Sequence, residues 1–175
     1  MAAVDFITLL GRVLQDGALR DAFQADANAF VRHSALREED RTSFVRLVPA
    51  ELEAQARVLL RKRFDLVRRL LPETCRKMGR DAWFEFERYG RSAAPARAAE
   101  VARDAAAFSE HLRATHATAL CLPEHNRARF VSAHRRLALH LVSVTPRNRT
   151  RRWGVQLLVR QRATRWRELM LFLGG

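Results

Sequence analysis

The sequence has few cysteines, no long apolar run and no basic segment before an apolar stretch at its N-terminus. Its two cysteines, Cys75 and Cys121, stand far apart among 175 residues, so they form neither a CxxC redox motif nor a pair of metal ligands. We expect both to be reduced thiols of a cytoplasmic protein. No apolar run approaches the roughly 20 residues that span a bilayer, and no basic segment precedes an apolar stretch at the N-terminus. We therefore expect neither a membrane segment nor a secretory signal.

Motifs that bind nucleotides or metals, or that supply a nucleophile, are absent as well. The seven glycines form no Walker loop and no GxGxxG, and GxSxG does not occur. Cys121 and His125 come closest to a nucleophile–base pair, but no third group is placed to orient the base. We therefore expect no catalytic residue, no metal and no cofactor in this chain. The six histidines form neither an HExxH motif nor an i, i+4 pair: His33, His111, His116, His125, His134 and His140.

Positive charge is abundant and unevenly placed. The formal net charge is +13, and of the 32 basic residues only Lys62 and Lys77 are lysines. The excess lies after residue 60, most densely over residues 147–167, which contain eight arginines and no acid. Such a stretch attracts an anion such as nucleic acid, an anionic membrane surface or an acidic peptide. The near-exclusive use of arginine also fits a coding bias, which would leave part of the excess without function.

Hydrophobic periodicity predicts helices throughout residues 1–134. Apolar residues recur at i, i+3 and i+4, and Pro49 stands at a first helical position. The strongest candidate for a loop is the segment from Gly90 to Pro95. The aromatic residues from Trp83 to Tyr89 are expected in the core. The expected helices run from Phe6 to near Gly17, from Leu19 to about His33, from Ser34 through Asp40, from Pro49 to Leu71, across residues 83–89, over residues 96–115 and from Pro123 to about His134.

After residue 134 the period changes to two. Leucines at 137, 139 and 141 alternate with other residues, and similar alternation follows from Trp153 and from Trp166. Period two with breaks at 146–148 and 161–163 predicts three antiparallel strands. We expect an α+β, mainly α fold: a helical region over 1–134 and a three-stranded β-meander over 135–175, packed as one domain. One apolar face of the sheet should pack on the helices, with arginines on the turns and on the other face.

Two surfaces of this fold are candidates for binding. One side of the long helix carries three arginines, Arg57, Arg61 and Arg68. They form either a solvated face or a contact surface for an anion or a partner. The sheet should leave an edge strand with unpaired backbone groups. An extended peptide can join such an edge, and nearby arginines would favour an acidic one. The alternative is a sheet that only covers the helices, with its edge protected by those charges.

Several stretches between residues 6 and 115 follow the pattern of a known family. They are the run EAQARVLLRKRF at 53–64, then Val67, Leu71-Pro72-Glu73-Thr74 and Met78-Gly79, together with the short helical segments around Leu9-Leu10, Asp16–Arg20 and Ala35–Glu39. These stretches resemble the small partner subunits of DUF692-type iron enzymes, the TglI- and MbnC-like proteins that act in the biosynthesis of ribosomally made, modified peptides (RiPPs).

The resemblance implies a partner and a substrate. The family binds the leader of a precursor peptide by strand addition to a small C-terminal sheet, and iron belongs to the larger enzyme with which it forms a heterodimer. The complex would oxidatively modify a cysteine of the peptide, in a 3-thiaglutamate- or methanobactin-type reaction. On this basis we expect Arg57, Arg61, Lys62 and Arg68 at the interface with the enzyme or the peptide's modified end. The leader would lie beside the third strand, at Arg165, Trp166, Arg167, Leu169 and Leu171.

A basic nucleic-acid-binding protein is the alternative from a different class. The charge favours it, but residues 1–60 hold slightly more acids than bases, and no helix-turn-helix or RNP pattern occurs. A nucleic-acid binder would lose affinity steeply as salt rises. A free-standing enzyme using histidines is the third possibility and would carry a stoichiometric metal.

Overall fold

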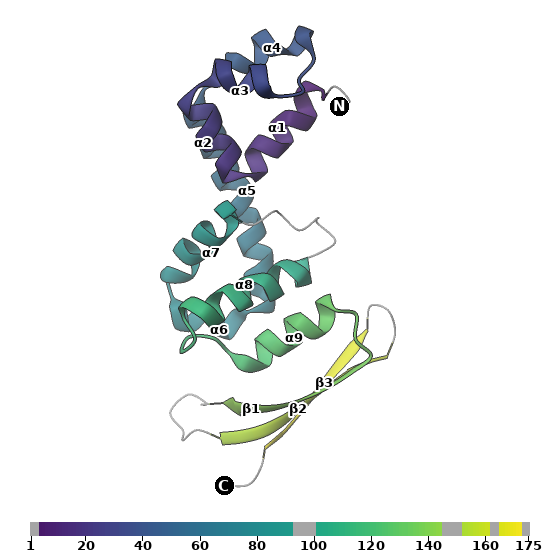
Figure 1. Cartoon of the computed structure of the whole chain (residues 1–175). Coiled ribbons are helices and arrows are strands. Elements are labelled where there is room, and N and C mark those ends of the chain that lie inside the picture. Colours follow the sequence, from purple (N-terminus) through teal and green to yellow (C-terminus); the bar gives the residue numbers. More distant parts are fainter. Residues whose placement is uncertain (1–3, 93–100, 145–151, 162–164, 173–175) are drawn as a thin grey trace. The chain divides into compact units, whose positions relative to one another are not determined.

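The computed structural model describes residues 4–92, 101–144, 152–161 and 165–172 and has the mainly helical α+β fold that the sequence predicts (Figure 1). These ranges contain nine helices followed by one antiparallel sheet. The elements are α1 (Phe6–Gln15), α2 (Gly17–Ala25), α3 (Ala27–His33), α4 (Glu38–Val45), α5 (Pro49–Leu70), α6 (Pro72–Met78), α7 (Asp81–Ser92), α8 (Val101–Thr115), α9 (Leu122–Ser132), β1 (Leu137–Val144), β2 (Arg152–Arg160) and β3 (Trp166–Phe172).

The chain divides into two compact units, residues 1–64 with 83–95 and residues 65–82 with 96–175. The division falls inside α5, between Phe64 and Asp65, so that this helix contributes to both units. The predicted packing of residues 1–134 and 135–175 as one domain stays a prediction.

Aspartate caps delimit the first three helices. The carboxylates of Asp5, Asp16 and Asp26 accept hydrogen bonds from backbone N–H groups in the first turns of α1, α2 and α3, at 2.7–2.9 Å. A side-chain oxygen in this position satisfies a donor that the helix leaves unpaired. The single helix predicted from Leu19 to His33 is therefore wrong. The backbone turns extended at Asp26 and a new helix begins there.

The first unit has an aromatic core. Phe23 packs edge-on against Phe30 and Phe44, with ring centroids 5.6 and 5.7 Å apart, in an arrangement that aromatic pairs favour. The buried members of this core are Leu9, Val13, Phe23, Val31, Leu36, Phe44 and Leu52.

Helix α7 differs from the prediction in two respects. It continues through Gly90 to Ser92, so the expected loop does not begin at Gly90, and residues 93–95 lie outside the described residues. A Cβ at Gly90 would stand 2.6 Å from Leu60 Cδ2; glycine here leaves room for that side chain. Phe86 and Tyr89 are buried as expected, but Phe84 is 58% exposed.

In the second unit, α8 packs on α9, and α9 lies against one face of the sheet (Figure 1). Phe108, Leu112 and Phe130 are fully buried there. The helix predicted over residues 96–115 is observed from Val101, and residues 96–100 lie outside the described residues. Helix α9 begins with Pro123 near its first position, as predicted.

The sheet is the predicted meander, with strand order β1-β2-β3 and both pairs antiparallel. Its register places Leu139 beside Leu157 and Leu157 beside Leu169. The alternate side chains of all three strands therefore form two common faces, because successive residues of a strand point to opposite sides.

Candidate functional site

The face of the sheet that packs on α9 is held by polar side chains. Gln156 is fully buried, and its amide nitrogen donates to the carbonyl oxygen of Pro123 at 2.9 Å and to Glu168 Oε1 at 2.8 Å. Asn126 donates to Gln156 Oε1 at 3.1 Å, and Arg127 pairs with Glu168 at 2.7 Å. A buried polar network of this kind, with its donors and acceptors satisfied, fixes one arrangement of the two elements.

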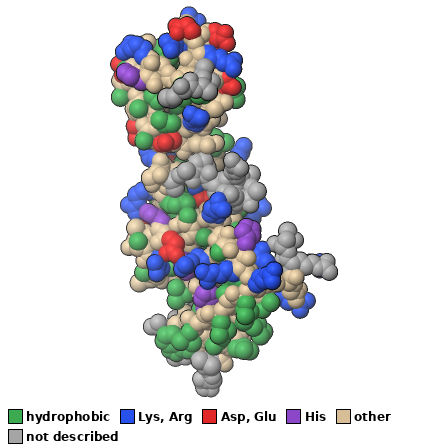
Figure 2. All heavy atoms as spheres, turned by 45° about the vertical axis from the view of Figure 1, so that its right-hand side comes forward, with side chains coloured by type: hydrophobic (Ala, Val, Ile, Leu, Met, Phe, Trp, Pro, Cys, Tyr) green, Lys and Arg blue, Asp and Glu red, His purple; other side chains and the backbone are tan. Residues whose placement is uncertain are grey.

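The opposite face, which we call the outer sheet face, is apolar and exposed. Leu139, Leu141 and Leu137 on β1 are 63–67% exposed, and Leu169 and Leu171 on β3 are 51% and 54% exposed. Figure 2 shows hydrophobic side chains gathered over the sheet. By the register, the outer sheet face consists of Leu137, Leu139, Leu141, Ser143, Trp153, Val155, Leu157, Val159, Arg167, Leu169 and Leu171.

We predicted one apolar face against the helices and arginines on the other face. The structure instead leaves the leucine-bearing face exposed. From β1, the side chains of Ala138, His140 and Val142 lie on the face toward the helices, whereas the three leucines of that strand face outward. Arg167 is the one arginine on the outer sheet face among the described residues. Contiguous exposed apolar surface of this kind is rare on monomers and marks interaction sites.

Strand β3 has a free edge. It pairs with β2 alone among the described strands, and the Gln161 N–H donates to the Arg165 carbonyl at 2.9 Å. Antiparallel ladders alternate between pairs that exchange both bonds and pairs that exchange none. Continued along the register, the alternation directs the backbone groups of Arg167, Leu169 and Leu171 to β2. Those of Trp166, Glu168 and Met170 point away from the sheet, at the free edge.

The five residues expected to bind a peptide divide between the two faces. Arg167, Leu169 and Leu171 lie on the outer sheet face, whereas Trp166 is half-buried on the helix side, where the Arg127 guanidinium lies 5.7 Å from its ring centroid. Arg165 is exposed just before the strand. A strand beside β3 would contact residues of both faces.

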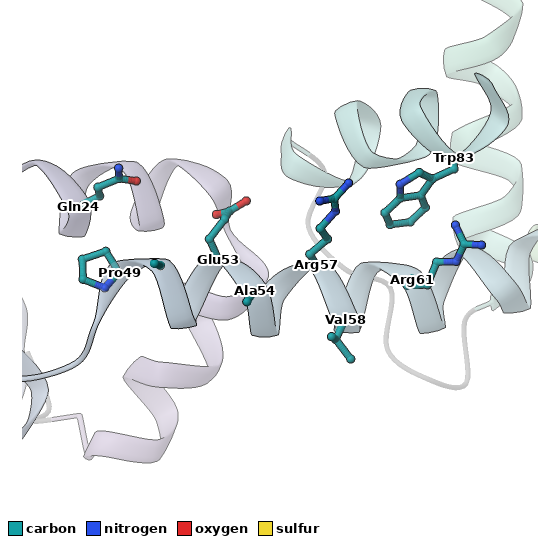
Figure 3. Close-up of a pocket in the computed structure, with 9 residues that line it drawn as sticks. Gln24, Pro49, Glu53, Ala54, Arg57, Val58, Arg61 and Trp83 are labelled. Carbon is teal, nitrogen blue, oxygen red and sulfur yellow. The ribbon is translucent and has the colours of Figure 1, made fainter. Parts of the chain in front are cut away.

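Two of the four residues expected at a partner interface line a groove of about 730 Å³ along α5. Figure 3 shows Trp83 of α7 lying between Arg57 and Arg61 of α5. The Arg61 guanidinium stacks 4.9 Å from a Trp83 ring centroid, and Arg57 pairs with Glu87 at 2.9 Å. Both guanidinium groups are thus held in place along the groove, which Trp83 also lines.

The other two residues of that prediction lie elsewhere. Lys62 is exposed in the first unit, next to Arg61 in sequence. Arg68 belongs to the second unit, where it pairs with Asp65 at 3.5 Å on the surface. The interface role of these four residues remains a prediction.

The cysteines and the potential metal ligands are the groups that would carry reactive chemistry. No group of three or more His, Cys, Asp and Glu side chains in that part of the chain could hold a metal ion. Burial, with Glu124 nearby, raises the pKa of the Cys75 thiol to about 11, and the same two causes raise the pKa of Cys121. Thiols with raised pKa values are poor nucleophiles.

Ser109 and His125 form a pair that sequence reasoning missed. His125 Nδ1 lies 2.8 Å from Ser109 Oγ, and its Nε2 lies 3.6 Å from Glu110 Oε1. The order serine, histidine, carboxylate suggests a nucleophile, but Ser109 is fully buried and no substrate could reach it. The pair serves to join α8 to α9.

Residues 47–114 match the family described as "SCO6045-like, C-terminal domain". The matched segment contains α5, α6, α7 and nearly all of α8, and stops before the sheet. It fits a small domain of the partner type and carries no information on TglI, MbnC or a DUF692 enzyme. Comparisons with curated proteins and with solved structures gave no match. In the described residues no helix is long and apolar enough to cross a membrane.

Proposed function

We propose that this chain is a non-catalytic, cytoplasmic partner subunit of a DUF692-type iron enzyme. In this role it binds the leader of a ribosomal precursor peptide as an additional strand beside β3. The enzyme supplies the iron and the oxidative chemistry on a cysteine of the peptide, of the 3-thiaglutamate or methanobactin type.

The observation that carries the proposal is the free edge of β3 bordering an exposed apolar face. A peptide in this place gains backbone hydrogen bonds from Trp166, Glu168 and Met170, and its alternate side chains reach the outer sheet face. The resemblance over residues 6–115 supports a subunit whose enzyme partner does the chemistry.

The proposal is tested by purifying the tagged chain from its native genomic context and measuring iron and bound peptide in the eluate. We expect a second, larger protein in equimolar amount, carrying iron. A chain that elutes alone without iron would refute the proposal. If it carries nucleic acid that is lost steeply as salt rises, the alternative function is correct.

Charge reversal tests whether the groove on α5 is the interface with the enzyme. In the same purification, Arg57→Glu with Arg61→Glu should weaken the association with the enzyme, because both guanidinium groups lie at the open groove on α5. The control, Arg32→Glu with Arg80→Glu, makes the same change of net charge at exposed positions that do not line the groove. Equal recovery of the enzyme with both variants would exclude the groove as the interface.

A further inference from the structure

Strand β3 constrains the chemistry of a strand bound beside it, because the side chains of neighbouring strands on one face meet directly. Directly opposite residues have Cβ atoms about 5 Å apart. Residues of the added strand opposite Arg167, Leu169 and Leu171 therefore extend the outer sheet face. The residues between them turn to the helix side and direct their backbone groups to Trp166, Glu168 and Met170.

Two of the three outer positions are apolar. Leu169 and Leu171 each expose about half of their side chain, and both stand beside further apolar residues of β2, Leu157 and Val155. An apolar side chain next to each would be covered on one side by this surface and would remove part of it from water.

The third outer position favours an acid. Arg167 is exposed, and its neighbour across the pair on β2 is Val159. Glu168 is the one carboxylate in the described strands, and it points to the other face, where Arg127 and Gln156 bind it. No ion pair to Arg167 exists among the described residues. A carboxylate on the added strand at this position would pair with it on an apolar surface.

Net charge argues against a second copy as the added strand. Pairing two β3 edges would bring together two chains that each carry +13, whereas an acidic strand is attracted to the same edge. Antiparallel pairing is somewhat more stable per residue than parallel pairing.

We infer that the ligand of β3 is an extended antiparallel peptide with the pattern apolar–x–apolar–x–acid. Its apolar residues lie beside Leu171 and Leu169, and its acid lies beside Arg167. This inference rests on the proposed strand addition and specifies the peptide that this edge selects.

The test uses the full chain and fluorescein-labelled synthetic peptides with the core Val-Thr-Val-Thr-Asp between Gly-Ser flanks. We expect saturable binding by fluorescence anisotropy at low ionic strength. It should be about fivefold weaker when Asp is replaced by Lys, as for an exposed charge pair. Binding should also weaken for the core Val-Val-Thr-Thr-Asp, which lacks the alternation, and for the reversed core. In Arg167→Glu the preference should invert in favour of the Lys peptide.

Removal of single backbone N–H donors tests whether binding uses the strand edge. N-methylation of the two Thr residues, whose N–H groups face β3, should abolish binding, whereas N-methylation of the two Val residues should not. In the protein, Met170→Pro removes an edge N–H that points away from β2, which edge strands tolerate. It should abolish binding in a chain with an unchanged circular dichroism spectrum, while Met170→Ala should still bind.

The outcomes distinguish the two proposals. If the Asp and Lys peptides bind equally, or Arg167→Glu leaves their order unchanged, the inferred pattern is wrong, while strand addition stands as long as Met170→Pro abolishes binding. If no peptide binds but the leader co-purifies through β3, the pattern is again wrong. If neither binds, strand addition itself is refuted. A dimer of the isolated chain that Met170→Pro dissociates would assign the edge to a second copy and overturn the inference.

Discussion

Glu124 lies inside the second unit, where its carboxylate accepts hydrogen bonds from the first turn of α6. Its carboxylate accepts from the backbone N–H groups of Glu73 and Thr74 and from Thr74 Oγ1, at 2.7–2.9 Å. The side chain is 3% exposed, so water cannot replace it. Its hydrogen-bond partners lie about 50 residues away in sequence, so no local pattern marks this role.

Glu124→Gln should therefore destabilise the protein by about 1–3 kcal/mol, since the amide NH₂ replaces an acceptor oxygen that faces donors. Urea denaturation measures the effect. The exposed Glu51→Gln is the matched control and should stay within about 0.5 kcal/mol of the parent. Equal midpoints for the two variants would contradict the capping role.

His125 makes stability depend on pH. Burial lowers its pKa below the ordinary 6.5, and Arg129, Arg113 and His140 lower it further, while Glu110 acts in the opposite direction. The folded state thus favours the neutral ring. The stabilisation is complete above pH 6.5 and is lost as pH falls below that value, where the unfolded chain takes up the proton first.

We expect the urea midpoint to fall between pH 6.5 and 5, and to fall less in His125→Gln, which keeps a polar group near Ser109. His140, whose pKa burial also lowers, accounts for part of the slope that remains. A slope in His125→Gln equal to that of the parent would show that His125 is not responsible.

At the scale of elements, Gly17 allows α2 to approach α7 closely. A Cβ at Gly17 would stand 2.7 Å from the backbone oxygen of Arg91, whereas a Cβ at Gly11 in α1 would meet nothing within 4 Å. Gly17 was expected to end the first helix; instead it follows the Asp16 cap as the first residue of the second.

Gly17→Ala should cost about 1–3 kcal/mol because the two helices must separate. Gly11→Ala should gain up to about 1 kcal/mol from helix propensity. The comparison requires only thermal unfolding of both variants. A Gly17→Ala variant as stable as Gly11→Ala would mean that the close approach is not maintained in solution.

The positions of helices and strands were easier to predict from the sequence than which side of the sheet packs on the helices. Proline at residues 49 and 123 and the change of period after residue 134 identified the long helix, the last helix and the three strands. The orientation of the sheet could not be predicted, because both faces of β1 contain apolar residues. The choice depends on Gln156 and Glu168, whose partners Asn126, Arg127 and the Pro123 carbonyl lie on another element.

The candidate site was predicted in part for the same reason. Alternation predicted β3, and Leu169 and Leu171 were assigned to peptide binding. The structure places both on the exposed outer sheet face, and their role in binding stays a prediction. Trp166, on the same strand, turned out to lie on the helix side under Arg127. Which residues of an edge strand face a ligand depends on which side the helices cover, and local sequence does not encode that.

For the whole molecule, the outer sheet face should dominate the behaviour of the isolated chain. Leu139→Lys with Leu141→Lys should lower the fluorescence of bound ANS and slow aggregation, with little loss of stability because both leucines are mostly exposed. Ile7→Lys, at a 74% exposed residue of the first unit, adds a positive charge elsewhere and should change neither readout. Unchanged ANS fluorescence in the double variant would mean that this face is already covered.

The exposed leucines of the outer sheet face should also affect the abundance of the protein in the cell. Chaperones and proteases act on exposed apolar surface, and the abundance of a protein follows the fraction of its molecules open to them. Copies synthesised in excess of whatever covers the outer sheet face would be removed first. The amount of this chain would thus follow the amount of whatever covers that face, without a dedicated regulator.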